Sequence, residues 1–156
     1  MLRDRFSDTL KTAMKAGDKP RVSTIRLIQA ALKDKDIEAR GLGKEPLADD
    51  DILALLQKMT KQRQESIAIY EANARPELAD GERAEVAIIA EFLPQQLGED
   101  EMRAAIAAAI TETGAASVKD MGKVIGKLRA DHAGRMDFAK ASGLVKEALA
   151  QGSASV

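Results

Sequence analysis

Apolar side chains recur at intervals of three or four residues along nearly the whole chain, and this spacing constrains the fold more than any other feature. In the first segment, for example, Leu2, Phe6 and Leu10 fall on one side of a helix. No segment shows the strict alternation that indicates a half-buried strand. Aromatic residues make up only 3% of the chain, so the core must consist mainly of aliphatic side chains. The sequence therefore predicts an all-α fold.

Glycine and proline residues divide this pattern into predicted helices. Four are expected first: over about 2–16, from Pro20 to the GLGKEP loop at 41–46, from Asp49 to the interruption at Arg75-Pro76, and over about 77–93. Three shorter helices are expected to follow, over about 99–112, 118–131 and 138–150.

The sequence LPQQLGED at 93–100 is the strongest candidate for a domain boundary. Pro94 disfavours helix for the residue before it, and Gly98 followed by two acids is typical of a new helix start. We therefore expect two unequal helical bundles. These are a four-helix N-terminal bundle over 1–93 and a three-helix C-terminal bundle over 94–150, followed by a frayed tail over 151–156.

Composition excludes several classes of function. The chain has no Cys, which excludes disulfides, cysteine-ligated zinc and a thiol nucleophile. Its first residues are amphipathic and charged, and no apolar run approaches the roughly 18 residues of a spanning helix. A net charge of −1 gives no overall attraction to nucleic acid or membrane. We therefore expect a cytoplasmic protein without a membrane partner, in which any nucleic-acid contact depends on a local patch.

Two glycines lie inside the predicted helix over 118–131, where each costs about 1 kcal/mol relative to alanine. Three lysines accompany them at intervals of four residues. On a helical wheel the apolar residues of this segment form one arc, and the glycines and lysines lie opposite or at its edges. The apolar arc consists of Val118, Met121, Val124, Ile125 and Leu128. The glycines therefore form a smooth outer strip that a partner can approach closely.

The charge around this strip favours an anionic partner. Residues 119–146 contain five Lys and two Arg against three Asp, a net charge of +4, which leaves −5 for the rest of the chain. Lysine and arginine on a smooth helix face suit a phosphate backbone. The candidate nucleic-acid-binding residues are Lys119, Gly122, Lys123, Gly126, Lys127, Arg129 and Arg135. Two alternatives stay open, namely a solvated helix face and a strip that packs against another helix.

No catalytic, metal or cofactor site is predicted. His132 is the only histidine. We interpret it as a residue near the C-terminal end of a helix, where it interacts favourably with the helix dipole. The side chains of the consecutive acids Asp49–Asp51 point apart on a helix. We therefore interpret them as charges that stabilise the helix N-terminus and not as ligands of a cation. Glu82 and Glu85 share a helix face, and we interpret them as ion-pair partners. The GLGK sequence lacks the strand and spacing of a phosphate loop.

Several motifs together resemble the GatB/YqeY family. DMGKVIG, GRMDF and SGLVKEAL are similar to its C-terminal signature, while KQRQES at 61–66 and FLPQQL at 92–97 resemble the free-standing YqeY-like proteins. The resemblance extends from the first helix to Leu149. Two positions depart from the family pattern: Phe92 stands where Tyr is frequent, and Ala74 stands where Gly often precedes Arg75.

This resemblance implies two unequal helical bundles. It also implies a relation to the B subunit of glutamine-dependent aspartyl/glutamyl-tRNA amidotransferase, a carbon–nitrogen ligase, whose tail contains the same C-terminal module and helps to hold tRNA. The chain resembles only that tail, so the implied function is a tRNA-binding accessory protein of translation without a catalytic site. The alternative is a protein-interaction module or helper subunit that docks on an amidotransferase or an aminoacyl-tRNA synthetase.

Overall fold

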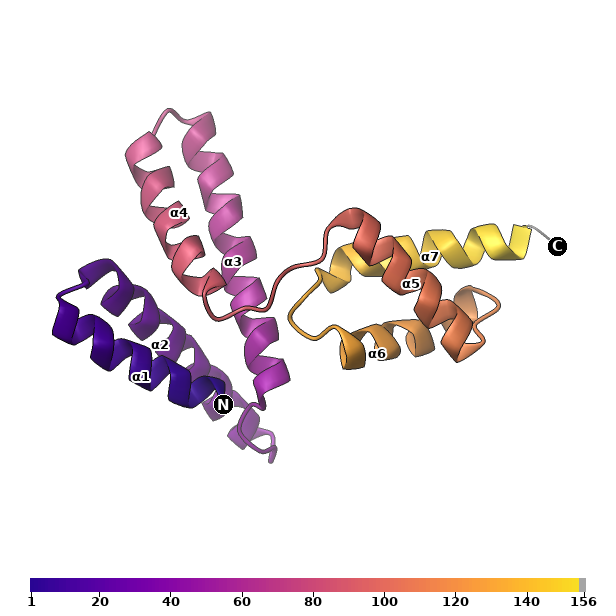
Figure 1. Cartoon of the computed structure of the whole chain (residues 1–156), viewed down its shortest axis with the longest axis horizontal. Helices are drawn as coiled ribbons and strands as arrows, with labels where there is room; N and C mark the ends of the chain where they lie inside the picture. The colour runs from indigo at the N-terminus through magenta and orange to yellow at the C-terminus, as the bar shows by residue number, and fades with distance from the viewer. Residues whose placement is uncertain (155–156) are drawn as a thin grey trace. The chain divides into compact units, whose positions relative to one another are not determined.

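The computed structural model describes residues 1–154, and within them the chain is helical without any strand (Figure 1). The predicted all-α fold is therefore confirmed. The elements are α1 (Leu2–Ala16), α2 (Lys19–Gly41), α3 (Asp49–Ala72), α4 (Pro76–Ala90), α5 (Glu99–Thr113), the 3₁₀ turn η1 (Val118–Asp120), α6 (Met121–Asp131) and α7 (Phe138–Ala154).

The chain forms two compact units that divide after Pro94. The first contains α1–α4 and the second contains α5–α7. Each unit has a separate hydrophobic core, because no residue of one cluster of buried side chains belongs to the other. The predicted boundary, between residues 93 and 94, lies one residue before this division.

Two aromatic rings pack against each other in the first core. Phe6 from α1 and Phe92, just after α4, meet edge to face with ring centroids 4.9 Å apart. This is the favoured geometry for aromatic pairs, and both rings are almost fully buried. Phe92 therefore fills an apolar position without the hydroxyl that Tyr would bring. The other buried members of this core are Leu2, Ile25, Ile28, Leu32, Ile52, Leu55, Leu56, Met59 and Ile89.

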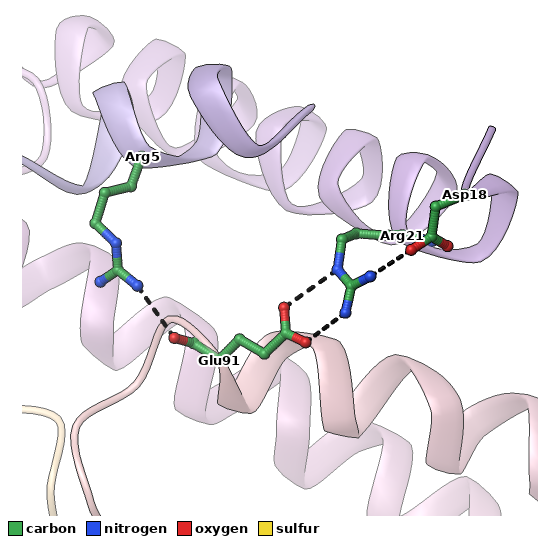
Figure 2. Close-up of polar contacts among 4 residues, drawn as sticks. All are labelled: Arg5, Asp18, Arg21 and Glu91. Carbon is green, nitrogen blue, oxygen red and sulfur yellow. Dashed lines mark hydrogen bonds and ion pairs between the residues drawn. The ribbon is translucent and has the colours of Figure 1, made fainter. Parts of the chain in front are cut away.

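Glu91, just after α4, joins the first two helices to the fourth (Figure 2). Its carboxylate accepts hydrogen bonds from the guanidinium of Arg21 on α2, and its main-chain carbonyl accepts one from Arg5 on α1 at 3.1 Å. Arg21 also pairs with Asp18, the N-cap of α2. The charge of Arg21 is therefore compensated within the first unit.

A second polar contact joins α1, α2 and the loop before α3. The Arg3 guanidinium donates two hydrogen bonds of 2.8 Å to the Asp36 carboxylate and a third, of 2.9 Å, to the carbonyl of Leu47. The Leu47 N–H in turn donates to Asp36 at 3.0 Å. The hydrogen bond from Arg3 is the main reason that the pKa of Asp36 lies below its ordinary value.

We predict that Asp36→Asn lowers the free energy of unfolding by about 1 kcal/mol at pH 7, because the charge-assisted pair is lost while the side chain keeps an acceptor for Leu47. The folded-state pKa is depressed, so this contribution is present above the unfolded pKa of about 4 and disappears as pH falls through the folded value. Urea unfolding at pH 7 and pH 3 measures it. The difference between wild type and variant should shrink at pH 3, and an unchanged difference would contradict the assignment.

The second unit differs from the predicted boundaries at two places. The helix expected from residue 118 begins at Met121, and Val118 is exposed instead of core-facing because it lies in the preceding turn. The last helix, expected to end at 150, continues to Ala154, so four residues of the predicted frayed tail are helical. The final two residues of that tail lie outside the described part of the chain.

Candidate nucleic-acid interface

A short turn positions the start of α6. The Asp120 carboxylate accepts hydrogen bonds from the backbone N–H groups of Ala116 at 2.9 Å and Ser117 at 3.4 Å. These bonds, in that order, are the main reasons that the pKa of Asp120 is lowered, and nearby Lys123 adds to the effect. Lys119 lies in this turn, before the start of α6. The prediction that Lys119 belongs to the same helix as Lys123 and Lys127 is therefore wrong.

The two glycines of α6 face open space. Gly122 and Gly126 are exposed, and a Cβ atom built on either one would meet no heavy atom within 4 Å. The opposite face of the helix is held in the core, where Val124 is 0% and Leu128 is 1% exposed. The glycines are therefore not required by packing inside the second unit. They leave a strip of helix backbone without side chains, which we call the glycine strip (Gly122 and Gly126).

The three lysines beside the glycine strip differ in how their charge is balanced. The Lys127 ammonium lies 3.0 Å from the Asp131 carboxylate and 3.3 Å from that of Glu112 on α5. Hydrogen bonds to Asp131 and then Glu112 raise the pKa of Lys127. Lys119 and Lys123 are exposed, and neither makes an ion pair with any residue that the structure describes. They are the two lysines with charge available to a partner.

Arg129 is also exposed, and its guanidinium carbon lies 5.3 Å from the centroid of the Phe138 ring on α7. This cation–π contact restrains the side chain, and Arg129 forms no ion pair with any residue that the structure describes.

Arg135 makes hydrogen bonds to the segment before α5, and the sequence did not indicate these contacts. Its Nε atom donates to the carbonyl of Gln95 at 3.1 Å, and its own carbonyl accepts from the Leu97 N–H at 2.8 Å. The side chain of Gln96 donates to the Gly134 carbonyl at 2.6 Å. Three bonds therefore attach the segment before α5 to the loop between α6 and α7. Arg135 is half-buried, and its guanidinium is used in this attachment.

The described residues contain no group of three or more His, Asp or Glu side chains that is arranged to hold a metal ion. Glu85 pairs with Arg63 at 2.7 Å, and Asp49 accepts a bond from the Leu2 N–H at 3.3 Å. These carboxylates therefore make contacts within the first unit. His132 is half-buried, and its Nδ1 atom has no hydrogen-bond partner in the structure.

The structure thus presents an all-helical protein with a second unit that exposes a bare, positively charged helix face. A comparison with protein families matches residues 3–149 to the family described as Yqey-like protein. This match covers nearly the whole chain, and the chain belongs to that family.

Curated relatives carry the name "Altered inheritance of mitochondria protein 41, mitochondrial". The protein from Lachancea thermotolerans is 35% identical over 105 residues, which cover 66% of this chain and 54% of that protein. The one from Pyrenophora tritici-repentis is 29% identical over 135 residues, or 84% of this chain and 71% of that protein. A Saccharomyces cerevisiae relative is 33% identical over 87 residues, or 55% and 45%. The match thus spans about half the length of the Lachancea thermotolerans and Saccharomyces cerevisiae proteins.

The prediction of a cytoplasmic location was wrong. These relatives are all named as mitochondrial proteins, and that finding overturns it. The prediction rested on the absence of cysteine and on the charged first residues, which do not distinguish one reducing compartment from another. Among the described residues, none of the helices is both long and apolar enough to cross a membrane.

We predict that Gly126→Ala raises the free energy of unfolding by about 0.5–1 kcal/mol, because Gly126 lies inside α6 with open space around it. Thermal unfolding followed by circular dichroism measures the change. Gly114→Ala is the contrasting variant, since Gly114 ends α5 with φ of 67° and should lose stability. A destabilised Gly126→Ala would show that the glycine strip is packed against another part of the protein.

Proposed function

We propose that this protein binds tRNA through the exposed face of α6, as a non-catalytic accessory protein. The observation that carries the proposal is the open glycine strip: Gly122 and Gly126 allow a sugar-phosphate backbone to approach the helix without meeting a side chain. Lys119 and Lys123 are exposed beside it, and neither forms an ion pair with a residue in the described part of the chain. Phosphate contacts by lysine supply most of the affinity in such interfaces.

The proposed contact recognises shape and charge. Segment 118–131 contains no aromatic residue on which a base could stack. Lysine contacts to phosphate fix position and orientation but do not discriminate between bases. Arg129 extends the positive surface from its place over Phe138. We therefore expect weak sequence preference and a strong dependence on salt.

The relation to glutamine-dependent tRNA amidotransferase belongs to the same proposal. The motif DMGKVIG resembles the tail of that enzyme's B subunit, and in this chain it supplies most of α6 and its open face. Amidotransferase subunits or an aminoacyl-tRNA synthetase are accordingly the protein partners that we propose for the complex with tRNA. The glycine strip also admits a second candidate, a partner helix that packs on the bare backbone, since small residues permit close helix contact.

The test is fluorescence anisotropy of labelled tRNA across a salt series. Phosphate contacts by Lys119, Lys123 and Arg129 predict a log–log slope of roughly −2 to −3 for the wild type. Lys119→Glu/Lys123→Glu should weaken binding at least tenfold in low salt and flatten the slope. The matched control is Lys58→Glu/Lys61→Glu on α3, which reverses two exposed lysines of the first unit and should bind like the wild type.

Equal loss in the two double variants would mean that net charge and not the α6 face determines binding. If the wild type does not bind tRNA in low salt, the proposal fails and the partner-helix candidate gains. Gly126→Leu then becomes the informative variant, because a bulky side chain should block a packed helix whatever the salt concentration.

A further inference from the structure

A second concentration of positive charge lies in the first unit, and the proposed tRNA contact does not use it. Residues 9–33 contain four Lys and two Arg against a single Asp, a net charge of +5. This segment covers the second half of α1, the connection at Gly17 and about the first two thirds of α2. Its charge exceeds that of residues 119–146, although it is shorter.

Most of this charge is not used inside the first unit. Arg21 and Asp18 pair with each other, and Arg21 also binds Glu91 (Figure 2). The remaining cations are exposed and make no ion pair with any residue in the described part of the chain. They are Lys11, Lys15, Lys19, Arg26 and Lys33.

An open groove of about 670 Å³ lies where α1 ends and α2 begins, and two of these cations line it. Its apolar lining includes Met14, Val22 and Leu27, and its charged lining consists of Lys19 and Arg26. Met14 is 53% exposed and Leu27 is 42% exposed, which leaves two large apolar side chains in contact with water. Among the residues that the structure describes, none with a carboxylate lines the groove.

Three positive side chains lie on one face of α2, and two of them, Lys19 and Arg26, line the groove. Lys19, Arg26 and Lys33 are seven residues apart on α2, so they share one face of that helix. Val22 lies between the first two on the same side and joins the groove. The groove thus combines apolar and positive side chains in its lining, which complements a helix with an apolar stripe bordered by Asp or Glu.

A nucleic acid fits these features less well. Exposed Met14 and Leu27 add nothing to a phosphate contact, and residues 9–33 contain no aromatic side chain for base stacking.

We propose that the groove between the end of α1 and the start of α2 docks an acidic amphipathic helix of a partner protein. This inference stands independently of tRNA binding by α6.

The experiment follows the methyl resonances of Met14 and Leu27 in the full chain by nuclear magnetic resonance. The probe is a synthetic peptide of about 18 residues with Leu on one helical face and Glu along its borders. A peptide of the same composition, with its order changed to remove the apolar face, is the control. We expect saturable shifts of both methyl groups with the first peptide, and at least tenfold weaker binding of the control.

Two variants test the positive and the apolar lining of the groove separately. Lys19→Glu/Arg26→Glu and Leu27→Asp should each weaken binding at least tenfold. Their matched controls, Lys58→Glu/Lys61→Glu and Ile69→Asp, change exposed side chains of α3 and should bind as the wild type does. Lys119→Glu/Lys123→Glu should also bind the peptide normally, because the α6 face is not involved. Circular dichroism verifies that every variant is folded.

Three results would overturn the proposal. The first is the absence of saturable shifts at Met14 and Leu27. The second is equal binding of the two peptides, which would reduce the effect to charge alone. The third is displacement of the peptide by a competitor, either tRNA or vesicles with anionic headgroups, when that competitor also shifts the same methyl groups more strongly than the peptide does. In that case the groove belongs to a nucleic-acid or membrane contact.

Discussion

Burial of Val124 and Leu128 in the core of the second unit is the constraint on which the candidate interface depends. Both are almost completely excluded from water, so they fix the rotation of α6 about its axis. Burying two such side chains contributes about 3–5 kcal/mol, which outweighs the cost of about 2 kcal/mol for two helical glycines. Gly122 and Gly126 consequently point outward, and the helix tolerates a bare face that its own stability does not require.

The balance of charge decides how that face can act. Lys127 is held by Glu112 and Asp131, whereas Lys119 and Lys123 remain available. The positive surface is therefore smaller than a count of basic residues suggests. The same reasoning separates Arg21, which is compensated by Asp18 and Glu91, from the free cations around the groove. In both units, internal ion pairs determine which positive charges remain available to a partner. The α6 face and the groove between α1 and α2 therefore suit partners of different chemistry.

The sequence predicted the helical class and the open side of α6 because both follow from periodicity within one segment. It misplaced Lys119, since the turn depends on two backbone N–H groups that bind the Asp120 side chain. It could not reveal the pairing of Lys127 with Glu112 or the bond from Arg135 to Gln95, because these partners lie on other segments. A charge count over residues 9–33 would have indicated the groove region, but only the structure places Met14 and Leu27 there.

Mapping tRNA on the protein by ¹H–¹⁵N nuclear magnetic resonance tests the central claim most directly, because it reports on the glycine backbone itself. The account predicts that the amide signals of Gly122, Lys123 and Gly126 shift or broaden on addition of tRNA and recover as salt is raised. Signals from α1 and α2 should stay in place. Unchanged glycine signals, together with shifts confined to the first unit, would contradict the assignment of α6 as the RNA-binding face.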